Sequence, residues 1–254
     1  MVLSMERWKG KVAVVTGASS GIGASICKKL VEEGLQVVGL ARRKNLIEEL
    51  AQELIDFEGK LFPLQADISK EEDILAAFDW IKSNLGPIHI LVNNAGLAQP
   101  TNLTNGSTDM WKKVLDVNVL GLCIATREAI QDMTKNNVDG HIIHINSIAG
   151  HKVPNIPSFN IYPASKFAVT ALTESLRVEL NSMESKIKIS SISPGAVGTE
   201  FVSQLELDDD SQLAKAFEFV LKPEDVADAV LYVLSTAPHV QIHELTIKPV
   251  NEPF

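Results

Sequence analysis

Four polar residues have side chains that could exchange a proton with an oxygen-bearing ligand. Tyr162 and Lys166 lie four positions apart, Ser147 lies 15 positions before the tyrosine, and Asn118 lies further upstream. Residues four apart on a helix share one face, so the phenol and the ammonium group can approach one ligand. A phenol has a pKa of about 10 and a nearby ammonium group favours the phenolate, so we expect a lowered pKa for Tyr162. Tyr162 could then act as acid or base on an alcohol or carbonyl oxygen that Ser147 holds.

A glycine-rich segment, Thr16-Gly-Ala-Ser-Ser-Gly-Ile-Gly23, follows a predicted strand and opens a predicted helix. Its glycines allow a tight turn, close approach of a pyrophosphate and close helix packing, and the helix N-terminus attracts an anion. Alone, the segment could be an ordinary turn, just as Tyr-x-x-x-Lys can arise by chance and a serine after a strand is commonly a cap. Together, these features indicate a dinucleotide cofactor that exchanges hydride with the substrate.

The second predicted strand ends in Ala41-Arg42-Arg43, and no acidic residue occurs between Glu33 and Glu48. A carboxylate here would hold the ribose 2′-hydroxyl of NAD, whereas arginine attracts the 2′-phosphate of NADP. The sequence therefore predicts NADP(H), with NAD(H) the weaker candidate. The alternative is that both arginines are simply solvated surface residues.

Two further segments follow predicted strands at the edge where doubly wound sheets bind ligands, Asp67-Ile68 and Asn93-Asn-Ala-Gly96. Asp67 could accept a hydrogen bond from adenine or cap the helix that starts near Ser69. Asn93 could face a flat ligand or tie neighbouring strands together. The cofactor contacts expected so far are Gly17, Ser19, Ser20, Gly21, Ile22, Gly23, Arg42, Arg43, Asp67, Ile68, Asn94, Ala95 and Gly96.

Short runs rich in valine and isoleucine alternate with segments of helical period, which predicts a single α/β domain over residues 1–254. We expect a doubly wound, seven-stranded, mostly parallel sheet with helices on both faces. A capping box at Ser69-Lys-Glu-Glu72 opens the third helix, and residues 199–221 form a mobile loop over the substrate. The expected strands are 11–16, 36–41, 60–66, 88–92, 141–145, 186–192 and 240–248, and the other helices are 18–33, 45–57, 107–136, 161–183 and 223–235.

These motifs, with Pro194-Gly195, occur in the order typical of the short-chain dehydrogenase/reductase family, which the sequence resembles over nearly its whole length. The resemblance implies a Rossmann-type fold, a water held by Asn118 in a proton relay, and ribose hydroxyls bound by Lys166. It also implies a homodimer or homotetramer through helices 107–136 and 161–183. The nicotinamide end of the cofactor would contact Tyr162, Lys166, Pro194, Gly195, Val197 and Thr199.

Two details differ from the commonest family pattern. Ser147 and Tyr162 are slightly further apart than usual, and Ser20 stands where some NADP-using members carry a basic residue. Both details resemble a branch that includes NADP-dependent farnesol dehydrogenases and a carbonyl and ketosteroid reductase, which implies a small apolar alcohol or carbonyl substrate. The residues expected to line its pocket are Ile148, Val153, Ile156, Phe159, Val197 and Phe201.

Composition narrows the possible partners and the compartment. The chain carries 23 Lys plus Arg against 32 Asp plus Glu, a net charge of -9, which argues against nucleic-acid binding. No apolar run approaches the roughly 18–20 residues of a membrane span, and the charged start is unlike a signal peptide. We therefore expect a cytoplasmic protein with Cys27 and Cys123 reduced. His141, His144 and His151 have no acidic or cysteine neighbours at ligand spacing, so we expect no metal.

The prediction is an NADP(H)-dependent oxidoreductase that interconverts a small apolar alcohol and its aldehyde or ketone, with Tyr162 as general acid and base. One alternative is a catalytically idle dinucleotide-binding sensor or scaffold, which would not need all four polar residues. Another is a nucleotide-sugar epimerase, which would use the same tyrosine and lysine but normally has a larger C-terminal region than the one after Gly195.

Overall fold

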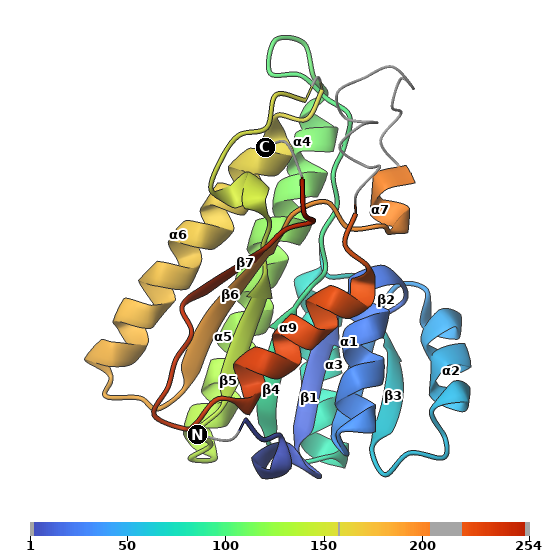
Figure 1. The fold of residues 1–254 in the computed structure, drawn as a ribbon, viewed down its shortest axis with the longest axis vertical. Helices are drawn as coiled ribbons and strands as arrows, with labels where there is room; N and C mark the ends of the chain where they lie inside the picture. Colours follow the sequence, from blue (N-terminus) through green and yellow to red (C-terminus); the bar gives the residue numbers. More distant parts are fainter. Residues whose placement is uncertain (1–2, 157, 204–219, 252–254) are drawn as a thin grey trace.

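The computed structural model describes residues 3–156, 158–203 and 220–251. Seven strands form one sheet in the order β3-β2-β1-β4-β5-β6-β7, and each neighbouring pair in the described sheet is parallel (Figure 1). This confirms the predicted doubly wound α/β class. The strands are β1 (Val12–Thr16), β2 (Gln36–Ala41), β3 (Lys60–Gln65), β4 (Ile88–Asn93), β5 (His141–Ile145), β6 (Lys188–Pro194) and β7 (Glu244–Ile247).

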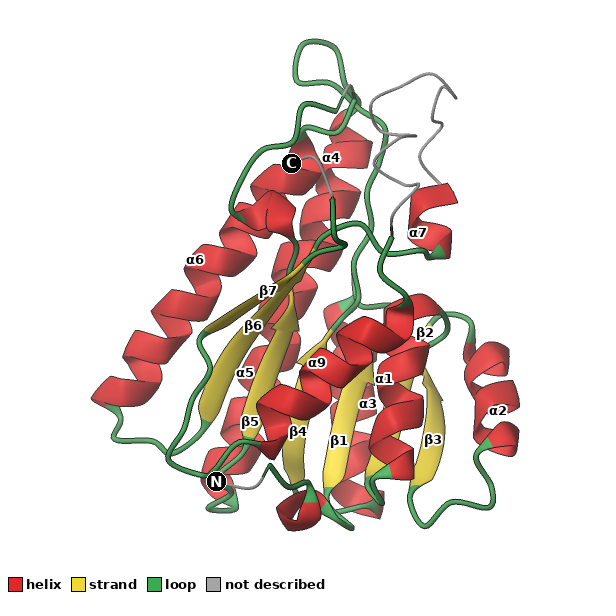
Figure 2. Ribbon diagram, in the orientation of Figure 1, coloured by secondary structure: helices red, strands yellow, loops and turns green. Residues whose placement is uncertain are grey.

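Helices cover both faces of the sheet (Figure 2). Strand β1 explains why, because all five of its residues are buried and alternate between two cores, with Ala13 and Val15 in one and Val12 and Val14 in the other. The first core is closed by α1 (Gly21–Glu32), α2 (Lys44–Glu53) and α9 (Pro223–Ser235). The second is closed by α3 (Glu71–Asn84), α5 (Leu122–Lys135) and α6 (Ile161–Ser182).

The strand order changes direction at β1, which lies between β2 and β4. Because the loops after β1 and β4 leave toward opposite sides of the sheet, a crevice opens at this carboxyl edge, where ligands of such folds bind. The shorter elements border this edge: the 3-10 turn η3 (Ile148–Gly150) follows β5, and α7 (Glu200–Ser203) follows β6. A first 3-10 turn, η1 (Glu6–Trp8), lies before β1.

The expected long helix over residues 107–136 is wrong in one respect. The structure has α4 (Thr108–Leu115), a π-helical segment η2 (Asp116–Gly121) and then α5. A Cβ atom on Gly121 would lie 2.3 Å from the carbonyl oxygen of Ile68, so the backbone comes very close to the loop after β3 here. Hydrophobic periodicity did not reveal the wider turn, which is a feature found frequently at functional sites.

The capping box expected at Ser69 and Glu72 is also wrong, because α3 begins at Glu71 and its N-cap is Lys70. Two aspartates organise this turn instead. The carboxylate of Asp67 accepts hydrogen bonds from the backbone nitrogen and hydroxyl of Ser69, at 3.0 and 2.8 Å. The carboxylate of Asp73 accepts one from the backbone nitrogen of Asp67 at 2.8 Å.

Several predicted boundaries shift. The second helix ends at Glu53 rather than near residue 57, and the last strand covers only Glu244–Ile247 of the expected 240–248. The expected mobile loop at 199–221 is described only at its two ends, and residues 204–219 lie outside the described part of the chain. Among the described residues, no helix combines the length and apolar character that crossing a membrane requires.

Candidate active site

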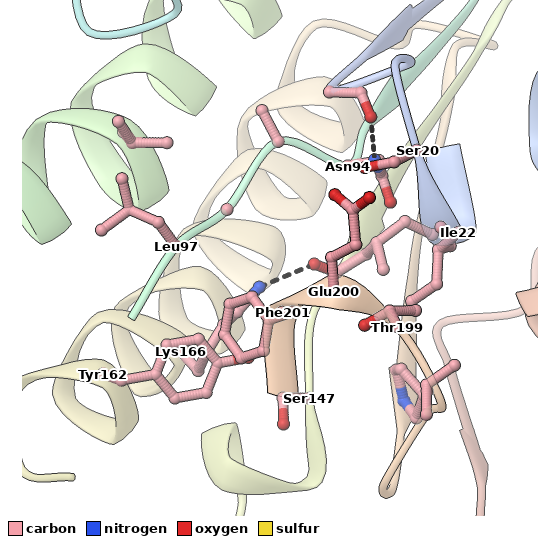
Figure 3. A pocket seen from close by; sticks show the side chains of 18 of the residues that line it. Ser20, Ile22, Asn94, Leu97, Ser147, Tyr162, Lys166, Thr199, Glu200 and Phe201 are labelled. Atoms are coloured by element: carbon pink, nitrogen blue, oxygen red, sulfur yellow. Dashed lines mark hydrogen bonds between the residues drawn. The ribbon is translucent and has the colours of Figure 1, made fainter. Parts of the chain in front are cut away.

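A cleft of about 520 Å³ runs along the carboxyl edge of the sheet, from the glycine-rich loop to Tyr162 (Figure 3). The structure places most of the predicted cofactor residues on its wall. Among the described residues, Gly23, Asn118 and Val153 are the predicted ones that do not line it. The predicted lining residues are Gly17, Ser19, Ser20, Gly21, Ile22, Arg42, Arg43, Asp67, Ile68, Asn94, Ala95, Gly96, Ser147, Ile148, Ile156, Phe159, Tyr162, Lys166, Pro194, Gly195, Val197, Thr199 and Phe201.

The glycine-rich loop needs its glycines for three different reasons. Gly17 and Gly21 have φ values of +67° and +54°, in the left-handed region that favours glycine. A Cβ atom on Gly17 would also lie 2.9 Å from the Cα atom of Ala95. Gly23 lies inside α1, where a Cβ atom would lie 2.2 Å from the carbonyl oxygen of Gly17. Gly23 therefore packs the helix against the loop and does not face the cleft.

Thr16 and Asn94 brace this loop against the end of β4. The side-chain amide of Asn94 donates to the carbonyl oxygens of Thr16 and Gly17, at 2.9 and 3.2 Å. The hydroxyl of Thr16 accepts from the backbone nitrogens of Asn94 and Ala95, both at 3.0 Å. The sequence motifs contained both residues but did not reveal this mutual support, because it joins two segments far apart in the chain.

The two arginines after β2 have different surroundings. The guanidinium of Arg43 donates to the hydroxyl of Ser20 at 2.8 Å and pairs with the carboxylate of Glu200 at 3.0 Å. Its positive charge therefore reaches Ser20, the position at which some NADP-using members of the resembled family carry a basic residue. Arg42 is exposed, and its charge acts on Asp67. Burial alone would raise the pKa of Asp67, but hydrogen bonds from Ser69 and the charges of Arg42 and Lys70 hold it below its usual range.

Three of the four predicted proton-transfer residues come together at the other end of the cleft. The Tyr162 phenol and the Ser147 hydroxyl line this end of the cleft together, and the hydroxyl accepts a hydrogen bond from the backbone nitrogen of Ala149 at 3.1 Å. The Lys166 ammonium group donates to the carbonyl oxygen of Ile145 at 2.9 Å. Figure 3 shows Tyr162 and Lys166 side by side on α6, with Ser147 nearby after β5.

The expected lowering of the Tyr162 pKa is not what the structure gives. Burial raises the pKa of Tyr162 to about 12, and the hydroxyl of Ser147 opposes this only in part. The rings of Phe159 and Phe201 flank the phenol, with centroids 4.7 and 5.4 Å from its own. Burial also lowers the pKa of Lys166 to about 8, so the ammonium form still predominates at neutral pH.

Asn118 lies behind the cleft, in the π-helical segment. Its side chain forms two hydrogen bonds with the backbone of Leu97, both at 2.9 Å, and donates to the hydroxyl of Ser165 at 3.0 Å. Ser165 in turn donates to the carbonyl oxygen of Tyr162 at 2.7 Å. Asn118 is therefore linked to the backbone of the tyrosine and to the loop after β4.

The substrate end of the cleft is apolar, but Val153 does not contribute to it. Its side chain is 64% exposed, whereas Ile148, Ile156 and Phe159 line the cleft. The loop after η3 thus presents alternate residues to the cleft and to solvent, which the apolar composition of the segment could not distinguish. Leu97, Val117 and Glu200 also line the cleft, and no sequence motif marked them.

The remaining candidates have structural partners. Asn93 is buried and donates to the hydroxyl of Thr126 at 2.8 Å, so it ties β4 to α5. His144 bonds Thr173 at 3.0 Å, and His141 bonds Ser190 at 2.9 Å. Burial lowers the pKa of each imidazole to about 3, so both histidines are neutral in the folded protein at neutral pH.

A family model described as short chain dehydrogenase matches residues 11–210. The chain belongs to the short-chain dehydrogenase family. It is therefore an oxidoreductase. Most of the motif residues that suggested the family line the same cleft.

This short-chain dehydrogenase is similar to individual proteins over nearly its whole length. A farnesol dehydrogenase from Aedes aegypti is 50% identical over 252 residues, covering 98% of this chain and 100% of the relative. Dehydrogenase/reductase SDR family member 11 from Bos taurus is 50% identical over 253 residues, covering 98% and 99%. A solved structure, the closed form of a serine dehydrogenase with NADP+, has a TM-score of 0.84 at 32% identity and covers 96% of both chains.

A nicotinamide dinucleotide fits the residues of this short-chain dehydrogenase. At one end, two glycines with positive φ let the backbone approach a pyrophosphate, and the arginines after β2 supply positive charge. At the other end, Ser147, Tyr162 and Lys166 line the cleft together with the small residue Gly96. The cleft thus suits an extended ligand that is anionic at one end.

Proposed function

We propose that this short-chain dehydrogenase is an NADP(H)-dependent enzyme that interconverts an apolar primary or secondary alcohol and its aldehyde or ketone. The observation that carries the proposal is one cleft with Arg43 bonded to Ser20 of the glycine-rich loop at one end and Tyr162, Ser147 and Lys166 at the other. A protein that only sensed a dinucleotide would not need an acid–base group and an oxygen-binding hydroxyl together at the far end.

In the proposed complex, Arg43 and Arg42 hold the 2′-phosphate, and the N-terminal end of α1 with its glycine-rich loop faces the pyrophosphate. Asp67 and Ile68 border the adenine, and Asn94, Ala95 and Gly96 border the middle of the cofactor. Lys166 binds ribose hydroxyls, while Pro194, Gly195, Val197 and Thr199 border the nicotinamide. When bound, the nicotinamide supplies the site that gives or takes hydride.

Tyr162 is the proposed proton donor and acceptor. Its pKa of about 12 keeps the phenol protonated at neutral pH, so it can donate to the oxygen of a carbonyl substrate during reduction. Ser147, which lines the same end of the cleft, donates to that oxygen and keeps it within reach of the phenol. In alcohol oxidation Tyr162 must first lose its proton, and the positive charge of Lys166 favours that phenolate. Asn118 holds a water that passes protons between Lys166 and solvent.

The substrate side favours an apolar molecule. Ile148, Ile156, Phe159 and Phe201 line the cleft beside Tyr162, and these side chains offer no hydrogen-bonding groups. A relative that is 50% identical is named farnesol dehydrogenase, which is consistent with a long apolar alcohol. We therefore propose isoprenoid alcohols and ketosteroids as the substrate classes to examine first.

Self-association is part of the proposal. Phe167 and Val178 on α6 and Leu115 and Leu120 near the π-helical segment are large apolar side chains that are exposed in the monomer. Such side chains are more costly in water than in an interface between copies. We propose a homodimer or homotetramer in which these helices meet.

The deciding experiment is a turnover screen of purified enzyme with NADP+ and NADPH over isoprenoid alcohols, retinoids, steroids and simple diketones. Formation or loss of reduced cofactor would be followed by its absorbance, and cofactor affinity by calorimetry. We expect turnover with at least one apolar substrate class. Tight cofactor binding without turnover across the whole panel would instead favour the sensor or scaffold.

A further inference from the structure

Arg43 is already engaged by an acidic residue that no motif marked. Its Nη2 atom lies 3.0 Å from Glu200 Oε2 and 2.8 Å from Ser20 Oγ, and Ser19 Oγ lies 3.5 Å away. Glu200 directly follows Thr199 and is the first residue of α7, so the ion pair joins the end of β2 to the segment after β6. Both ends of the pair lie on the wall of the cleft, and Figure 3 shows the Glu200 carboxylate on the same side of the cleft as Ser20.

The Glu200 carboxylate occupies the guanidinium that the proposed function assigns to another anion, the 2′-phosphate of the cofactor. A 2′-phosphate held by Arg43 must approach the guanidinium that the Glu200 carboxylate contacts. The two anions would also repel each other if both stayed near Ser20. NAD carries an uncharged hydroxyl at the same position, so its ribose can bind while the ion pair stays intact.

We propose that Glu200 competes with the cofactor's 2′-phosphate for Arg43 and thereby limits how strongly the enzyme prefers NADP(H) over NAD(H). The inference rests on the proposed NADP(H) preference and deepens it. Glu200 is thus a specificity-determining residue that acts against the phosphate, whereas the two arginines act for it. The ligand class it discriminates is a ribose 2′-phosphate monoester against a free 2′-hydroxyl.

Solvent exposure makes this competition reversible. The side chains of Arg43 and Glu200 are 50% and 60% exposed, and ion pairs at such sites contribute little net stability. A phosphate monoester carries more charge than a carboxylate and presents more acceptor oxygens to a guanidinium, so it can displace Glu200. Displacement still costs part of the binding free energy of NADP(H) and none of that of NAD(H).

The test compares the affinities of NADP+ and NAD+ for the full-length enzyme by isothermal titration calorimetry. Glu200→Gln keeps the size of the side chain and removes its charge. We expect it to tighten NADP+ binding about three- to ten-fold, as removal of an exposed competing charge should, and to leave NAD+ within about two-fold. Glu58→Gln is the matched control, because Glu58 pairs with Lys9 at 3.5 Å away from the cleft.

A second pair of variants shows whether the effect passes through Arg43. In an Arg43→Ala background, Glu200→Gln should change NADP+ affinity much less than it does in the wild type. If Arg43→Ala weakens NADP+ binding but Glu200→Gln leaves it unchanged or weakens it, the competition is overturned while the proposed phosphate site stands. If Arg43→Ala itself leaves NADP+ affinity unchanged, the role of Arg43 in the phosphate site fails, and the competition fails with it. Thermal unfolding of each apo variant would check that the fold is retained.

Discussion

The Lys166 ammonium group lies 5.7 Å from the centroid of the Tyr162 ring and is held there by the carbonyl oxygen of Ile145, 2.9 Å away. Two elements set this relationship: α6 places the lysine one turn after the tyrosine, and β5 supplies the carbonyl that orients it. The hydrogen bond to Ile145 at the end of β5 therefore fixes the position of the lysine charge relative to the phenol ring.

Tyr162→Phe should reduce turnover by at least about a thousand-fold while changing cofactor affinity by less than about three-fold, because only the proton-exchanging hydroxyl is removed. Turnover and cofactor titration on the same preparation would measure both. The other tyrosine, Tyr232, is exposed on α9, so Tyr232→Phe is a matched control that should retain wild-type rates. Substantial activity in Tyr162→Phe would contradict the role assigned to the phenol.

Arg42→Asp should reverse the cofactor preference, because an acidic residue after β2 repels a 2′-phosphate and accepts from a 2′-hydroxyl. We expect the ratio of kcat/KM for NADP+ over NAD+ to fall by at least about ten-fold. Lys44→Asp makes the same charge change two residues later, where Lys44 pairs with Glu48 at 3.0 Å, and should have a smaller effect. An unchanged ratio in Arg42→Asp would refute a role of Arg42 in phosphate binding.

Carbonyl reduction should slow as pH rises through about 8. Lys166 has a pKa of about 8, so its charge is present below that pH and lost above it, while Tyr162 stays protonated up to about 12. The rate loss therefore reports the lysine and not the phenol. In Lys166→Arg the cation persists at all these pH values, so the fall should move upward in a profile scaled to its own maximum. A wild-type profile that stays level from pH 7 to 10 would rule out this dependence.

Acid should destabilise the fold through the buried histidines. His141 and His144 have pKa values of about 3 when folded and about 6.5 when unfolded, so below about pH 6.5 the unfolded state binds more protons. The free energy of unfolding should fall by about 1.4 kcal/mol per pH unit for each histidine between pH 6 and 4. Urea unfolding of His144→Gln should give a shallower pH dependence, and the exposed control His239→Gln should not. Equal slopes in all three proteins would contradict the assignment.

Local features made part of the site predictable. The helical spacing of Tyr162 and Lys166 and the glycine-rich loop after a buried strand are short-range patterns, and each corresponds to a helix or turn in the structure. Val153 was wrongly placed because an apolar residue in a loop can point either way. The capping box was wrong because α3 begins at Glu71 with Lys70 as its N-cap, so Ser69 precedes the cap and its hydroxyl donates to Asp67 instead.

The sequence by itself determined the fold class and the family, and it predicted the residues that we propose for proton transfer, because these depend on residue type and short spacing. Tertiary structure alone decided the pairing of Arg43 with Glu200, the position of Asn118 behind Leu97 and the burial that raises the pKa of Tyr162. Each of these depends on segments far apart in the chain that meet at one sheet edge. Contacts and desolvation at that edge have no signature in local spacing, so only the folded arrangement reveals them.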